Sequence, residues 1–162
     1  MKEFSIPIQI KYERPFIELY KLPALIDTRS VIPVVSLYPA MIEKFFEMKL
    51  ILSNQFVEGY EKGSVYSVSE FKIGDLIFED FEFFVPDDPK FSFPFLLSAT
   101  LFYGMEYTFD TINGKFIVRI TDEQSLKRDF KIKSLRDKLY PQIDGVLLQD
   151  IDIELQDFFI IM

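Results

Sequence analysis

Apolar and polar side chains alternate near the start of the chain, which predicts a strand with one buried face. The apolar positions of this segment are Phe4, Ile6, Ile8 and Ile10. Pro7 favours an edge strand, because proline has no N–H to donate to a neighbouring strand. Residues 15–22 and 23–27 predict two further strands, and the second is apolar on both faces, which indicates burial. The strand pattern resumes over residues 31–36.

The middle of the chain changes from a strand pattern to a helical one and back. Ser36 fits a helix N-cap, and apolar residues at helical spacing predict a helix over residues 37–48. Residues 54–74 carry three glycines between alternating runs, which predicts a long hairpin with a glycine-bearing tip. Phenylalanine, isoleucine and acidic residues are mixed over residues 75–85, where we expect a strand.

The last third of the chain contains the clearest local signal. Residues 106–120 predict a hairpin, because Asn113-Gly114 is a preferred turn pair and alternating apolar residues flank it. Short helices are predicted over residues 95–105 and 134–141, and the alternating C-terminal end over residues 150–162 predicts a last strand. No repeat or linker interrupts the chain. The pattern predicts one mainly β domain over the whole length, with one or two short helices.

The composition fits a single domain with a substantial core. The chain has 162 residues, of which 49% are hydrophobic and 17% aromatic, with 19 Phe and 8 Tyr. This content is far too apolar for a disordered chain. This is more phenylalanine than one small core usually contains. We therefore also expect a subunit interface.

Charge and missing residue types exclude several classes of function. The net charge is −8, and phosphate binding needs a basic face, so a nucleic-acid partner is not expected. The chain has no Cys and no His, which removes thiolate and imidazole metal sites and the Ser-His and Cys-His nucleophiles. Acid and base chemistry near neutral or acidic pH must therefore use carboxylates, with Lys and Tyr as weaker candidates. We expect no cofactor and no metal.

The alternating first residues do not form a signal peptide, and no stretch approaches the length of about 20 apolar residues that a membrane span needs. No membrane partner and a cytoplasmic location are therefore expected.

The sequence ALIDTRS, residues 24–30, ends a buried strand with a carboxylate and a hydroxyl. It resembles the active-site signature of the retropepsin-like aspartic peptidases, in which an apolar pair is followed by Asp-Thr-Gly and a small residue. Asp27 and Thr28 match that signature, and Ser30 is acceptable as the small residue. Arg29 departs from it, because it replaces the glycine.

The resemblance extends over about residues 4–120. The hairpin at 54–74 lies where that family has its flap, and residues 73–85 resemble the strands that follow the flap. Residues 93–116 resemble the family's late helix-and-hairpin unit, although Leu97-Ser98-Ala99 stands where a glycine is usual. The helix predicted after the Asp-Thr turn and the C-terminal extension lie outside the resemblance.

The resemblance implies a single-lobed, closed β-barrel that acts as a homodimer on extended peptides. Asp27 would be the catalytic residue, contributed once by each chain, because two close carboxylates share a proton and so provide both acid and base. Thr28 would hold the two turns together. The flap residues that contact substrate would be Gly59, Tyr60 and Gly63. The terminal strands are natural candidates for the dimer sheet, because apolar edges need partners.

Arg29 opposes this chemistry. A guanidinium within about 4–6 Å of the carboxylate pair favours ionisation of both, which works against the shared proton. We therefore expect reduced or lost activity unless Arg29 turns outward to another acid. The alternative function is a catalytically inactive binding or assembly module with the same fold.

Other interpretations of these residues remain open. Asp27 also fits an ordinary turn-capping aspartate at a strand end. Asp110-Thr111 repeats the dipeptide, but Ile112 and the Asn113-Gly114 turn favour a hairpin there. The high aromatic content is compatible with a third function, a β-barrel for a lipid or another small ligand.

Overall fold

The computed structural model describes residues 2–27, 30–57, 61–90, 93–149 and 159–161, and the protein is mainly β. The strands of the first half are β1 (Lys2–Pro7), β2 (Gln9–Lys11), β3 (Arg14–Leu19), β4 (Leu22–Asp27), β5 (Val34–Val35), β6 (Met48–Val57), β7 (Glu61–Ile73) and β8 (Leu76–Pro86). The later strands are β9 (Phe95–Ser98), β10 (Glu106–Asp110), β11 (Lys115–Ile120), β12 (Lys127–Leu135), β13 (Lys138–Ile143), β14 (Val146–Leu147) and β15 (Phe159–Ile161). The helical elements are α1 (Pro39–Ile42) and the 3₁₀ turn η1 (Ala99–Phe102).

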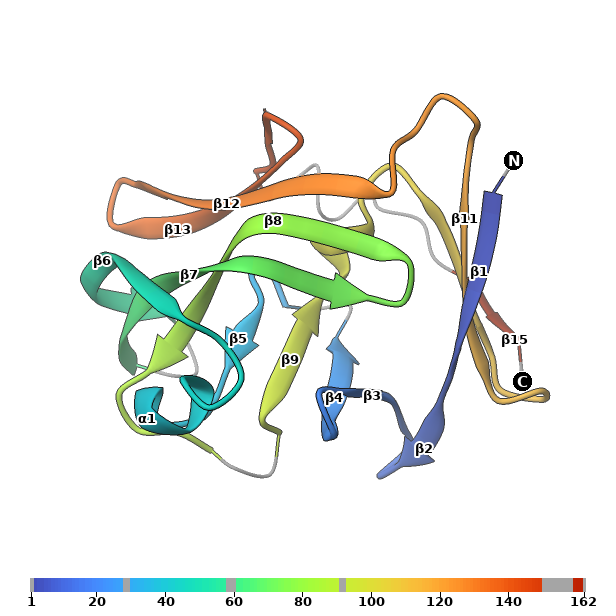
Figure 1. The fold of residues 1–162 in the computed structure, drawn as a ribbon, viewed down its shortest axis with the longest axis horizontal. Helices are drawn as coiled ribbons and strands as arrows, with labels where there is room; N and C mark the ends of the chain where they lie inside the picture. The colour runs from blue at the N-terminus through green and yellow to red at the C-terminus, as the bar shows by residue number, and fades with distance from the viewer. Residues whose placement is uncertain (1, 28–29, 58–60, 91–92, 150–158, 162) are drawn as a thin grey trace.

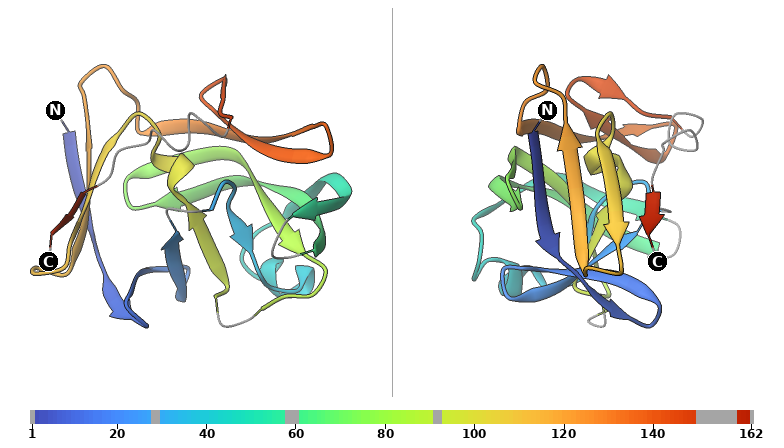
Figure 2. Two further views of the ribbon diagram at one scale, coloured as in Figure 1. Left: turned by 180° about the vertical axis from the view of Figure 1, so that it is seen from behind. Right: turned by 90° about the vertical axis from the view of Figure 1, so that its right-hand side faces the viewer.

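One sheet brings the two ends of the chain together. Its strands lie in the order β1, β11, β10 and β15, and the right-hand view of Figure 2 shows them side by side. β11 pairs antiparallel with both β1 and β10, whereas β15 is parallel to β10. The first predicted strand therefore contains an edge strand, β1, as Pro7 indicated. The strand predicted at the C-terminal end is confirmed over Phe159–Ile161.

The larger sheet contains most of the remaining strands. Its order is β14, β13, β12, β8, β5, β9, β4, β3 and β2, and the β6–β7 hairpin joins through β8. In Figure 1 the β7–β8 ribbon crosses the front of the molecule, with β12 and β13 above it. Over the described residues neither sheet closes on itself. The closed barrel that the resemblance implied is thus not seen, and two open sheets take its place.

Aromatic rings fill the interior in two groups. Phe71 stacks on Phe81 at 4.6 Å between ring centroids, under β7 and β8. Phe102 and Phe116, at 5.1 Å, pack under the smaller sheet. Large buried rings give up more water contact than any other side chains, so these groups dominate the core energetics. Among the described phenylalanines, Phe45 and Phe56 are the ones that are largely exposed. Most of the phenylalanine content is therefore accounted for by the core.

The helix predicted over residues 37–48 is much shorter in the structure. α1 ends at Ile42, turns continue to residue 45, and β6 already begins at Met48. Ile42 is buried, and Phe46 packs edge-on against Tyr20 at 4.7 Å. These two contacts use the i and i+4 positions that indicated a helix, but they anchor a single turn before the chain pairs with β7. Tertiary pairing overrides the local pattern here.

Two further helix predictions are wrong in whole or in part. Residues 134–141 form the β12–β13 hairpin, with Arg136 and Asp137 at φ 52° and 62° in its turn. Residues 95–105 begin as the buried strand β9 and become helical only in η1. A short apolar run fits a buried strand and a buried helix equally well, and β9 is held between β4 and β5.

Both predicted hairpins are confirmed with changed bounds. β6 and β7 form the long hairpin, which starts at Met48 rather than at residue 54. β10 and β11 form the other hairpin. Asp110 pairs with Lys115, which leaves a loop of four residues, 111–114, so Asn113-Gly114 does not form a two-residue turn. Within the described residues, no helix has the length and apolar character that crossing a membrane requires. The cytoplasmic location stays a prediction.

Candidate active site

The loop after Asp27 crosses the end of a third strand. β4 runs parallel to β9, and β9 runs antiparallel to β5, so β9 lies between two strands that follow each other in the chain. In Figure 1 the arrows of β4 and β9 point the same way and the arrow of β5 points the opposite way. The segment that leads into β5, described from Ser30 onwards, lies at the end of β9, where Ser98 is the last residue.

Two buried hydroxyls at the end of β9 hold this crossing segment. Ser98 and Thr100 are both 0% exposed. Ser98 Oγ lies 2.7 Å from the carbonyl oxygen of Ser30 and 2.9 Å from that of Val31, and Thr100 Oγ1 lies 3.0 Å from the Val31 carbonyl. The two hydroxyls also contact each other, with either able to donate, so their two protons are shared between that contact and the carbonyls of Ser30 and Val31. Together the two hydroxyls provide hydrogen bonds to the carbonyls of Ser30 and Val31, which are partly buried.

Further hydrogen bonds define the shape of the turn itself. The backbone N–H of Ser30 donates to the carbonyl of Asp27 at 3.3 Å. Ser30 Oγ donates to the carbonyl of Ile32 at 2.7 Å, a local bond of the kind that serine makes in turns. Ser98 Oγ also accepts the backbone N–H of Thr100 at 3.2 Å, which caps η1. Residues 30–32 are thus held both by local hydrogen bonds and by the two hydroxyls at the end of β9.

Asp27 is the last residue of β4, half-buried, and opposite Ser98 in the register of the two parallel strands. Ala24, Leu25 and Ile26 before it are buried, as the sequence predicted. A carboxylate at the end of a buried strand is placed by the sheet rather than by a flexible loop, which favours fixed geometry. Such a group is suited to general acid or base chemistry.

The other residues of the predicted turn and flap divide into two groups. Thr28, Arg29, Gly59 and Tyr60 lie outside the described residues, so their predicted roles stay predictions. Gly63 is described and lies within β7, opposite Gln55 of β6 and Pro86 of β8.

The position of Gly63 demands a glycine for packing. A Cβ there would meet the Val85 carbonyl oxygen at 2.3 Å and Phe84 Cζ at 2.5 Å. Neither distance is compatible with a side chain, so Gly63 allows β7 and β8 to approach closely. Its predicted contact with substrate stays a prediction.

The Asp110-Thr111 repeat forms a hairpin, which confirms the preferred interpretation of that segment. Asp110 Oδ1 accepts the backbone N–H of Asn113 at 3.0 Å, and Oδ2 accepts its side-chain N–H at 2.8 Å. The hydrogen bonds from the side chain and then the backbone of Asn113 hold the pKa of Asp110 below its ordinary value. Asp110 therefore has a structural function in the loop.

The terminal strands, β1 and β15, pair with strands of the same chain. β1 and β15 form the two edges of the smaller sheet, on opposite sides of the β10–β11 hairpin. Over the described residues, no group of three Asp or Glu side chains gathers where it could hold a metal ion. The dimer sheet stays a prediction.

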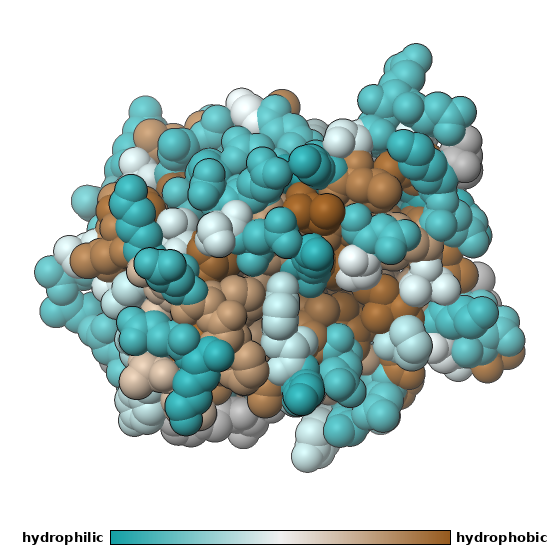
Figure 3. Space-filling view, in the orientation of Figure 1, coloured by the Kyte–Doolittle hydropathy of each residue, from teal (hydrophilic) through white to brown (hydrophobic). Residues whose placement is uncertain are grey.

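The surface in the orientation of Figure 1 mixes polar side chains with apolar ones (Figure 3). Large apolar residues are exposed just before α1, in α1, in the turns after it and on β6: Tyr38, Met41, Phe45, Leu50, Ile51 and Phe56.

Sequence reasoning identified the aspartate but missed the hydroxyls that support it. Ser98 stood out only as a departure from glycine, and Thr100 was placed in a helix. Their partners lie 68 and 69 residues away in the sequence, at Ser30 and Val31. Small hydroxyl residues directly after an apolar run were the available signal.

Comparison with known proteins gives one structural similarity. No family model matches the chain, and no curated protein matches it. A retropepsin-like aspartic protease from Rickettsia conorii, known from its crystal structure, is similar over 72% of this chain and 89% of that chain. The sequence identity is 15% and the TM-score is 0.49.

Proposed function

We propose that the chain is one subunit of a homodimeric, retropepsin-like aspartic endopeptidase that cleaves extended peptides. The observation that carries the proposal is the position of Asp27, at the end of a buried strand and next to a turn held by Ser98 and Thr100. The Asp-Thr sequence and the order of the elements around it add support. In the dimer, Asp27 of each chain faces Asp27 of the other.

Two facing carboxylates explain how one aspartate per chain suffices. Like charges in contact cannot both ionise, so the pair holds one proton between them. The ionised carboxylate takes a proton from water as the water oxygen attacks the peptide carbonyl carbon. The protonated carboxyl donates to the carbonyl oxygen. A dyad of this kind needs neither histidine nor cysteine, which agrees with their absence from the sequence.

Arg29 favours a second candidate function, an inactive binding or assembly module. A guanidinium next to the dyad would stabilise two negative charges and remove the shared proton. The two candidates make different predictions for the same pair of variants, Asp27→Asn and Arg29→Gly.

Cleavage of a mixed peptide library between about pH 3 and pH 7, the range in which a carboxylate dyad titrates, tests the proposal. An endopeptidase cleaves the library, loses that activity in Asp27→Asn and is blocked by a statine-type inhibitor. The conservative Asp88→Asn, at an exposed loop acid, serves as the matched control. A folded wild-type dimer that leaves the library intact would support the binding module instead, and cleavage gained in a folded Arg29→Gly variant would show that the guanidinium disables the dyad.

A further inference from the structure

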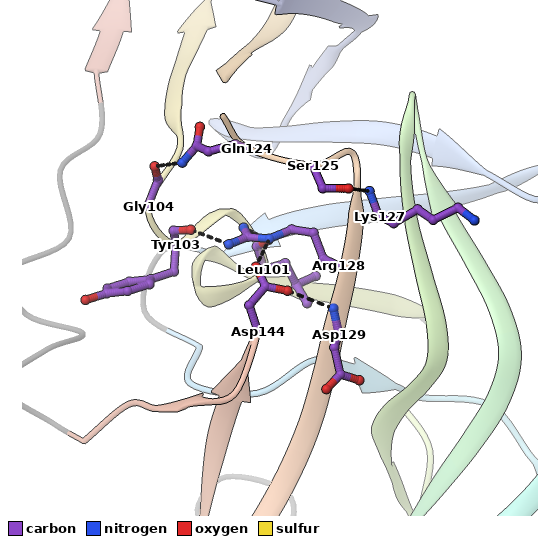
Figure 4. A network of polar contacts seen from close by, with 9 residues as sticks. All are labelled: Leu101, Tyr103, Gly104, Gln124, Ser125, Lys127, Arg128, Asp129 and Asp144. Carbon is purple, nitrogen blue, oxygen red and sulfur yellow. Dashed lines mark hydrogen bonds and ion pairs between the residues drawn. The ribbon is translucent and has the colours of Figure 1, made fainter. Parts of the chain in front are cut away.

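Arg128 is a buried arginine in the C-terminal part of the chain, outside the retropepsin resemblance. Its side chain is 6% exposed, and its Nε, Nη1 and Nη2 each donate to an oxygen atom. Nη1 donates to the carbonyl of Leu101 at 2.9 Å, and Nη2 donates to the carbonyl of Tyr103 at 2.6 Å. Nε donates to the Asp144 carboxylate at 3.0 Å (Figure 4). One guanidinium thus joins β12, the turn after β13 and the segment after β9.

The two carbonyls that Arg128 contacts lie at the end of η1, where a helix leaves its last carbonyls without partners. The carbonyls of Thr100 and Phe102 accept backbone N–H groups from the following residues. The carbonyls of Leu101 and Tyr103 accept hydrogen bonds from Arg128 instead. The planar guanidinium, with several donors in fixed directions, suits this task better than the single ammonium of lysine.

Asp144, in the turn after β13, holds the Arg128 side chain in place. The Asp144 carboxylate accepts both the Arg128 Nε–H and, at 2.9 Å, the backbone N–H of Asp129. Burial lowers the pKa of Arg128, and the charge of Asp144 opposes that shift. Gln124 adds a second link to the same segment, because its Nε2 donates to the Gly104 carbonyl at 2.6 Å (Figure 4).

The other end of η1 reaches the turn of the candidate active site. Ser98 caps η1, and Thr100 belongs to it. Their hydroxyls hold the carbonyls of Ser30 and Val31 beside Asp27. A rotation or fraying of η1 would carry Thr100 Oγ1 away from Val31 and release the loop.

We propose that Arg128 is a positioning residue for Asp27, acting through η1 and the hydroxyls of Ser98 and Thr100. This inference rests on the proposed function and assigns a role to the C-terminal extension, which the resemblance leaves unexplained. Arg128 of the extension holds the segment after β9 by hydrogen bonds, and the hydroxyls of that segment in turn hold the residues that follow the Asp27 turn.

Hydrogen exchange measured by mass spectrometry tests the structural part without any activity. The variant is Arg128→Lys, which keeps the charge but has no fork of donors. The matched control is Arg119→Lys, because Arg119 also donates to a carboxylate, Glu3 Oε2 at 2.8 Å, but at the surface of the smaller sheet. We expect about tenfold faster exchange over residues 30–36 and 99–104 in Arg128→Lys, with no change over residues 106–120. Arg119→Lys should leave residues 30–36 as they are.

The result that overturns the proposal is equally specific. Faster exchange confined to residues 99–104 and 127–149, or spread evenly over the whole chain, would give Arg128 a merely structural role. Should Arg128→Lys fail to fold, Asp144→Asn decides the question, since the Asp144 side chain is 46% exposed and its loss frees Arg128 to move. Unchanged exchange over residues 30–36 in that variant would also overturn the proposal.

The chemical part has its own measurement. If wild type cleaves peptides, Arg128→Lys should lower kcat about tenfold with KM nearly unchanged, as expected when transition-state alignment is lost. If wild type cleaves nothing, the proposed function fails while hydrogen exchange still decides the role of Arg128.

Discussion

Asp27 and Ser98 lie opposite each other at the ends of two parallel strands, and the chain that leaves Asp27 is held down by the Ser98 hydroxyl. The register places the donor directly beneath the loop that crosses it. The strand that carries the aspartate and the strand that supports its turn are therefore aligned by the same sheet.

Ser98→Ala should lower the free energy of unfolding by about 1–3 kcal/mol, because it removes the donor to the partly buried Ser30 carbonyl and a hydrogen-bond partner of the buried Thr100 hydroxyl. Urea denaturation measures the change. Ser125→Ala is the matched control, since Ser125 is exposed and accepts only the backbone N–H of Lys127. A loss in Ser98→Ala no larger than in Ser125→Ala would show that the hydroxyl does not hold the loop.

Gly63→Ala should destabilise the protein by about 1–3 kcal/mol through overpacking against β8. The added Cβ meets a backbone oxygen, Val85 O at 2.3 Å, which has little freedom to move. Ser64→Ala, at the next position of the same strand, should have a much smaller effect. A thermal melt compares the two variants, and equal melting temperatures would refute the packing argument.

Asp110→Asn should reduce the amount by which the free energy of unfolding falls when the pH is lowered. The pKa of Asp110 in the folded protein lies below its ordinary value, so its contribution is present above the unfolded pKa of about 3.9 and disappears as pH falls through the folded pKa. Unfolding midpoints of wild type and variant should therefore differ most near neutral pH and converge in acid.

Asp87→Asn, at an exposed position in a loop, is the control for this titration. If the difference between wild type and Asp110→Asn stays constant from neutral pH to about pH 2, where carboxylates are protonated, the hydrogen bonds from Asn113 do not favour the charged form.

Strands could be predicted from the sequence wherever apolar residues alternate or run continuously, but the turns between them could not. Three two-residue turns have both central residues at positive φ without glycine: Tyr12-Glu13, Tyr20-Lys21 and Arg136-Asp137. The usual signal for such turns is Asn-Gly or Asp-Gly. Pairing of the flanking strands imposes the conformation here, as the β3–β4 register from Leu19 to Leu22 illustrates.

Tyr20 shows why these residues are tolerated in the turn. Its ring lies 5.4 Å from that of Phe71, and its hydroxyl accepts the backbone N–H of Lys72 at 3.0 Å. Core contacts thus compensate for the left-handed backbone. Asn113-Gly114, the pair with the strongest local preference, lies instead in a four-residue loop that Asp110 caps.

The candidate site was predictable in part for the same reason. Asp27 is recognised from contiguous residues, whereas Ser98 and Thr100 act on residues almost seventy positions earlier. Arg128 is a further case, because its partners at Leu101, Tyr103 and Asp144 come together only in the folded chain. Contacts between distant segments leave no local pattern to read.

The central claim is that two copies of Asp27 face each other across a dimer, and disulfide formation in Asp27→Cys tests it directly. The chain has no cysteine, so this variant carries a single thiol. A disulfide requires Cα atoms within about 4.4–6.8 Å. We predict a covalent dimer that forms under mild oxidation far faster than in Ser53→Cys, an exposed control on β6. A folded Asp27→Cys that stays monomeric, or cross-links no faster than Ser53→Cys, would contradict the account.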